Sequence, residues 1–190
     1  MAAKYFSSGN NTARYEIVQN LTQRIQNGEK MSPIAQIMAS IIFSDQKDYK
    51  SGLMSISTEE NNLECLSMRI QLLLALNRPD LAKNQLKNIM MLDEDSVISQ
   101  LASIQYNLYS NSLKGTNDAF EACKELIDRF GASSVLLNSQ AVALISQNRL
   151  DEAYSLLLEA FRLDSSDGTV LANIIAIVDR IGGSEEVNLY

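Results

Sequence analysis

The sequence predicts an all-α protein, an α-solenoid in which helical hairpins stack on one another. Only two prolines and eight glycines interrupt the 190 residues, so long helices can form. Apolar residues recur at helical spacing, and no stretch alternates with period two for long enough to indicate a strand. Paired helices also return at a nearly constant distance along the chain, which is the pattern of a repeat protein.

The chain is predicted to have a flexible lead-in over residues 1–12 and a single solenoid domain over residues 13–190. The lead-in is small and polar around Ser7 and Asn11. A first helix is expected near residues 14–27, with Gly28 ending it. Ser32-Pro33 opens the next helix, because serine caps a first turn and proline is tolerated there.

Further along, the chain is expected to repeat a helix–turn–helix unit. The predicted pairs are 63–76 with 79–92, 95–110 with 117–130, 134–147 with 150–163, and 168–181 followed by a new helix from Ser184. Ser96, Ser134 and Ser184 are the expected caps at three of these helix starts.

A small residue early in each second helix sets the period of the repeat. The residues at this position are Lys50 or Ser51 in a weaker first unit, then Ala82, Ala119, Ala153 and, in the last unit, Val187. The last three positions are equally spaced, whereas the interval from Ala82 to Ala119 is longer, so we place a three-residue insertion within 111–115. A helical hairpin that repeats every ~34 residues is typical of the tetratricopeptide architecture.

The first helices of the repeats are apolar on more than one face, which a helix with a single buried stripe does not need. Two apolar stripes predict neighbours on both sides, as in stacked repeats. In residues 134–147 one stripe holds Leu137, Ala141 and Leu144, and the other holds Val135, Val142 and Ile145.

The residue types argue against catalysis. The sequence has no histidine, which removes the commonest general base and metal ligand. It has no phosphate-binding loop, and its two cysteines, Cys65 and Cys123, cannot form a zinc site without further ligands. A net charge of −7 repels nucleic acid. We therefore predict a non-enzymatic protein without cofactor or metal.

A partner-binding surface is the function that remains. In a tetratricopeptide solenoid the first helices of the repeats line the concave side. When the repeat is aligned along the chain, it predicts an apolar row on this side, where an apolar segment of a partner could lie. An alternative is that a closed superhelix buries part of this row itself. The row consists of Phe43, Leu74, Leu101, Ile104, Leu108, Val142 and Ile145.

Several segments resemble the epsilon subunit of coatomer, the protein coat of COPI vesicles. They are LECLSM (63–68), QLLL (71–74), LNRPDLAK (76–83), LDED (92–95), QLA (100–102), LLNSQA (136–141) and GGSEEV (182–187). The resemblance extends from about residue 1 to residue 190. The family has further helices before and after the matching region, so the chain looks like a fragment of a longer subunit.

The resemblance implies a structural subunit that binds the C-terminal domain of the alpha subunit and stabilises it. It implies action in Golgi-to-ER and intra-Golgi transport, in the cytoplasm, with peripheral attachment to Golgi membranes and COPI vesicles only through the coat. The alternative is another tetratricopeptide adaptor, such as one that binds peptide carboxylates. The basic clamp of such adaptors is missing here, where Glu64 and Gln71 stand instead.

Overall fold

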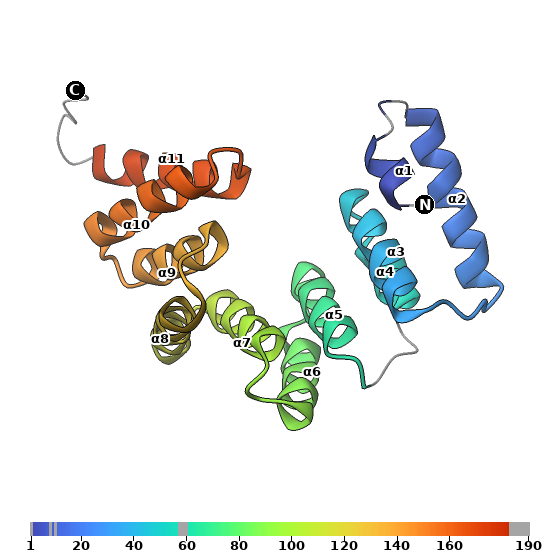
Figure 1. The fold of residues 1–190 in the computed structure, drawn as a ribbon, viewed down its shortest axis with the longest axis horizontal. Helices are drawn as coiled ribbons and strands as arrows, with labels where there is room; N and C mark the ends of the chain where they lie inside the picture. Colours follow the sequence, from blue (N-terminus) through green and yellow to red (C-terminus); the bar gives the residue numbers. More distant parts are fainter. Residues whose placement is uncertain (1, 8, 10, 57–60, 183–190) are drawn as a thin grey trace. The chain divides into compact units, whose positions relative to one another are not determined.

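The computed structural model describes residues 2–7, 9, 11–56 and 61–182, which form eleven helices and no strand. Its contacts divide the chain into two compact units, Met1–Ala102 and Ser103–Tyr190, which are described separately below. The prediction of one domain over residues 13–190 stays a prediction. Figure 1 shows the helices in chain order.

The first unit is built from helical hairpins. It holds α1 (Ala2–Ser7), α2 (Asn11–Gln26), α3 (Pro33–Asp45), α4 (Tyr49–Ser55), α5 (Leu63–Ala75), α6 (Pro79–Leu92) and the start of α7 (Val97–Ser110). α3 packs on α4 and α5 on α6, and both helices of the first hairpin also contact α5. This is the stacking that two apolar stripes on a first helix predict.

The second unit begins within α7 and continues in the same pattern. It holds α8 (Leu113–Phe130), α9 (Ser134–Ser146), α10 (Leu150–Leu163) and α11 (Gly168–Gly182). α9 packs on α8 and α10, and α10 also contacts α11. Its core cluster consists of Leu137, Ala141, Leu144, Ala153, Leu157, Ala160, Val170 and Ile177. We call α3, α5, α7, α9 and α11 the first helices, and α4, α6, α8 and α10 the second helices.

Each hairpin turns through one residue in the left-handed conformation. These residues are Lys47, Asn77, Asn111 and Asn148, with φ values of 58°, 56°, 46° and 61°. Asparagine tolerates this region better than most residues with a Cβ atom, which explains three of the four. The four residues therefore give a common origin for numbering α3, α5, α7 and α9, which we call the turn register.

The stretch predicted to be a flexible lead-in contains α1, and its Tyr5 side chain is 0% exposed. The Tyr5 hydroxyl donates a hydrogen bond to Asp45 Oδ2 at 2.6 Å and accepts one from Gln46 Nε2 at 2.5 Å. The buried Tyr5 ring thus attaches α1 to the end of α3. The polar residues around Tyr5 gave no indication of this helix in the sequence.

Most predicted helices are present within a few residues of their expected ends, and α6 and α10 match residue for residue. The start of α8 differs, because the three inserted residues extend its first turn instead of forming a loop. Ser112 caps that turn by accepting from the Gly115 N–H at 3.1 Å. Ser133, not the predicted Ser134, caps α9. The predicted helix start at Ser184 lies outside the described residues.

The small-residue position of the first repeat also differs from the prediction. Gly52, not Lys50 or Ser51, occupies it, since its N–H bonds the carbonyl oxygen of Asp48 just as the Ala82 N–H bonds that of Arg78. A Cβ atom on Gly52 would lie 3.2 Å from Leu72 Cδ2 and 3.4 Å from the Ser40 carbonyl oxygen. The short spacing of this hairpin concealed the position in the sequence.

Candidate partner-binding surface

The seven residues predicted to line a concave row differ widely in exposure. Phe43, Leu74 and Ile104 are buried, at 0%, 8% and 1% exposure. Phe43 belongs to a core cluster with Tyr5 and Leu21. Most of the surface of these three side chains is covered by the protein itself. The other four are partly exposed: Leu101, Leu108, Val142 and Ile145.

The turn register explains the burial of Phe43 and Ile104. Phe43 stands four residues before Lys47, as Leu144 stands four before Asn148. Ile104 stands seven before Asn111 and so corresponds to Ala141. Leu144 and Ala141 both belong to the core cluster that α9 shares with α10. Phe43 and Ile104 therefore occupy core positions of their hairpins, and Phe43 also packs against residues of α1 and α2.

On α9 the predicted residues lie together on a partly exposed apolar face. Val142 and Ile145 are three residues apart and half-buried. Ile145 also packs against the core cluster, so only part of its side chain is available to a partner. Val135, which the predicted row omits, extends this face and is 62% exposed. On α7, Leu101 and Leu108 share one face at a spacing of seven.

A second exposed apolar stripe lies on α3 and was missed by the sequence prediction. Ile34 and Met38 are 68% and 40% exposed, and Ile41 follows at the next helical position. Their i, i+4, i+7 spacing is visible in the sequence. The sequence prediction did not include this stripe because it took Phe43 as the residue of the row on α3. Phe43 lies on another side of the same helix.

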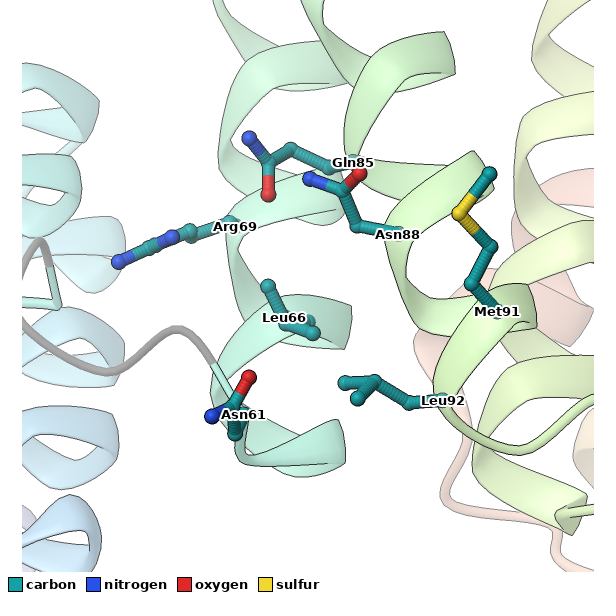
Figure 2. A pocket seen from close by; sticks show the side chains of 7 residues that line it. All are labelled: Asn61, Leu66, Arg69, Gln85, Asn88, Met91 and Leu92. Atoms are coloured by element: carbon teal, nitrogen blue, oxygen red, sulfur yellow. The ribbon is translucent and has the colours of Figure 1, made fainter.

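A pocket of about 400 Å³ opens between α5 and α6. Figure 2 shows Leu66 and Leu92 facing each other across it, with Asn61 at its edge and Arg69 directed away from α6. The remaining lining residues are Gln85, Asn88 and Met91.

Two polar side chains that line this pocket differ in their hydrogen bonding. Arg69 is already engaged, since its Nε and Nη2 donate to the Ile56 carbonyl oxygen at 3.0 and 2.8 Å. The buried Oε1 atom of Gln85 accepts no hydrogen bond among the described residues. The lining residues include no carboxylate, thiol or other group that could act as base or nucleophile.

Titratable groups elsewhere in the described chain also show no catalytic arrangement. Burial raises the pKa of the Cys123 thiol to about 12, so it stays protonated and unreactive. A hydrogen bond from Arg78 lowers the pKa of Asp80 to about 2. An equivalent bond from Arg149 lowers the pKa of Glu152 at the start of α10. No group of His, Cys, Asp or Glu among the described residues could hold a metal ion.

Comparison with known proteins gives the family. The profile of the family described as "Coatomer epsilon subunit" matches residues 1–189. The chain belongs to the coatomer epsilon subunit family. This confirms the resemblance carried by the sequence segments. Because members of this family are structural subunits, it also confirms the prediction that the chain is not an enzyme.

Individual relatives agree with this assignment. Coatomer subunit epsilon-2 of Oryza sativa subsp. indica is 29% identical over 153 residues, covering 80% of this chain and 51% of the relative. Coatomer subunit epsilon of Dictyostelium discoideum is 29% identical over 177 residues, covering 92% and 58%. That of Caenorhabditis elegans is 28% identical, covering 87% and 56%. The chain thus spans about half the length of the curated relatives it matches.

A solved structure supports the fold. A tetratricopeptide repeat protein from Parabacteroides merdae superposes with a TM-score of 0.74 at 13% identity, covering 88% of this chain and 66% of the other. This confirms the predicted class, an α-solenoid of tetratricopeptide-like repeats. None of the described helices is long and apolar enough to cross a membrane.

Proposed function

We propose that the chain forms part of a structural subunit of the COPI vesicle coat and binds the C-terminal domain of the alpha subunit. In this proposal it acts in Golgi-to-ER and intra-Golgi transport, in the cytoplasm, and reaches Golgi membranes and vesicles only through the coat. Family membership supports the coat role. The observation that supports partner binding is the exposed apolar face of α9.

The α9 face has the chemistry of a protein-binding surface. Val135 and Val142 stand seven residues apart, so their side chains lie along one side of the helix. Val135 is 62% exposed, and two apolar side chains in water stabilise a complex when a partner covers them. Leu101 and Leu108 on α7 are further candidates for binding a partner, on the same chemical grounds.

Charge substitution on α9 tests the proposal. Val142→Asp, alone and with Val135→Asp, is expected to weaken pull-down of the C-terminal domain of the alpha subunit at least tenfold, because a carboxylate would be buried without a partner. Ile145 is left unchanged, since its side chain also supports the core. The matched control is Leu163→Asp, at a 54% exposed apolar site on the second helix α10.

The Leu163→Asp control distinguishes the loss of a binding surface from a general loss of stability. All variants should keep wild-type helical content, as measured by circular dichroism. Wild-type pull-down by the α9 variants, or equal loss with Leu163→Asp, would refute the use of this face. Titration with acidic C-terminal peptides tests the adaptor alternative, and saturable binding there would favour it. Exposed Glu64 and Gln71 on α5 argue against that outcome.

A further inference from the structure

Asn27 and Gly28 lie at the end of α2, and they are the one asparagine–glycine pair in the sequence. Gly28 has a φ of 67°, and its N–H donates to the Ile25 carbonyl oxygen at 3.0 Å. The Glu29 N–H donates to the Arg24 carbonyl oxygen, also at 3.0 Å. This pair of hydrogen bonds is the usual way in which a helix ends at a left-handed glycine.

The surroundings of Asn27 leave its side chain open to attack by the backbone that follows it. Asn27 and Gly28 are both exposed. The Asn27 carboxamide forms no hydrogen bond within the described part of the chain. A Cβ atom at Gly28 would have no neighbour within 4 Å beyond the adjoining residues, so the approach to the Gly28 nitrogen is not crowded. Because glycine has no side chain, its backbone dihedral angles also change at little cost.

We propose that Asn27 is a site of spontaneous deamidation. The Gly28 nitrogen gives its proton to water or hydroxide and attacks Cγ of Asn27. The bond between Cγ and the carboxamide nitrogen then breaks, ammonia leaves, and a five-membered succinimide ring remains. One water molecule opens this ring. Opening at the side-chain carbonyl gives aspartate, and opening at the main-chain carbonyl gives isoaspartate, in which the backbone runs through Cγ.

The reaction needs a local opening at the end of α2. The Gly28 N–H must leave the Ile25 carbonyl oxygen before its nitrogen can attack. Helix ends open locally far more readily than a whole protein unfolds. Asn148 provides a contrast, because it also follows the end of a helix and is exposed, but arginine comes after it. The side chain of Arg149 hinders attack by the Arg149 nitrogen, so Asn148 should react much more slowly.

Isoaspartate at position 27 loosens the last turn of α2. Its backbone contains one extra methylene group, so neither of the two hydrogen bonds that end the helix keeps its geometry. The ion pair between Arg24 Nε and Glu29 Oε2, at 2.7 Å, spans the same residues. Ile25 packs against the core cluster that α1, α2 and α3 share, so the loosened turn also loses contacts with the core. This inference concerns the chain itself and does not rest on the proposed coat function.

Peptide mapping of the folded 190-residue protein tests the site. After incubation in mildly alkaline buffer, the tryptic peptide 25–30 should gain the mass of an amide-to-acid change and become a substrate for protein isoaspartyl methyltransferase. Its conversion should be at least about tenfold faster than that at Asn148, because only Asn27 precedes a glycine. Asn27→Gln should stay unmodified, since its longer side chain would have to form a less favourable six-membered ring.

Limited proteolysis tests the loosening of α2. Trypsin should cleave the deamidated fraction, separated by ion exchange, after Arg24 at least about threefold faster than the unmodified protein. The matched control is Asn27→Asp, which has the same charge and a normal backbone and should be cleaved at close to the wild-type rate. Conversion at position 27 only after unfolding in urea, or equal rates at Asn27 and Asn148, would overturn the site. Cleavage of the deamidated fraction no faster than that of Asn27→Asp would overturn the loosening.

Discussion

Ile104→Ala tests the turn register, because the register places Ile104 in the core and the projected row places it on the surface. The substitution removes three carbon atoms from a side chain that is 1% exposed. At about 0.8 kcal/mol for each buried carbon this loses about 2.4 kcal/mol. The cavity left behind brings the expected loss of unfolding free energy into the range of about 2–5 kcal/mol.

The assay is urea unfolding followed by circular dichroism, with Leu101→Ala as the control on the same helix. Leu101 is partly exposed, so its truncation should cost about 1 kcal/mol. If the slope of the unfolding free energy against urea concentration is unchanged, both variants expose the same amount of surface on unfolding as the wild type. A loss below about 1 kcal/mol for Ile104→Ala, or equal losses for the two variants, would refute the register.

Three further predictions follow from the turns, the buried thiol and α1. Asn148→Val should lower the unfolding free energy by about 1–2 kcal/mol and Asn148→Gly should not, because φ is 61° there; equal melting temperatures would contradict this. The pKa of Cys123 is raised in the folded state from about 9 to about 12, so its contribution to stability is complete below pH 9 and is lost as pH rises toward 12. Wild type should therefore lose stability relative to Cys123→Ala over that range, and parallel pH curves would exclude the effect. Tyr5→Phe removes two hydrogen bonds and should cost about 1 kcal/mol, with earlier proteolysis near α1; unaltered digestion would count against the docking of α1.

The helices could be predicted because their ends are marked by local chemistry. Ser32-Pro33 opens α3, and Ser32 Oγ accepts from the Ala35 N–H at 3.4 Å as a capping serine should. Asn77-Arg78-Pro79 ends one helix and starts the next within three residues. Such signals need no knowledge of tertiary contacts, so the sequence alone is sufficient for them.

The exposure of each side chain in the predicted row could not be read from the sequence in the same way, because exposure depends on rotation about each helix axis. Successive residues on an α-helix are about 100° apart, so an alignment error of one residue moves a side chain from the surface into the core. The turn residues Lys47, Asn77, Asn111 and Asn148 are unequally spaced along the chain, so a constant period misplaces some first helices. Only the turns fix the rotation, and the first of them has a lysine, which does not mark a left-handed position in the sequence.

The turn register also allows residues at equivalent positions of different first helices to be compared for exposure. Ile34 and Val135 both stand thirteen residues before their turn residue, and they are 68% and 62% exposed. α5 has Glu64 at this position, also exposed. Each unit thus presents one strongly exposed apolar side chain at the same place in a hairpin, and α5 presents a charge there.

This comparison predicts which side chains anchor a partner. Ile34→Asp and Val135→Asp should each weaken pull-down of the C-terminal domain of the alpha subunit by about tenfold or more, because each places a charge against apolar partner surface. Glu64→Ala should change binding by less than about threefold, since an exposed carboxylate contributes little. If Glu64→Ala weakened binding more than Val135→Asp, recognition would be electrostatic, and the apolar faces of α3 and α9 would have no part in it.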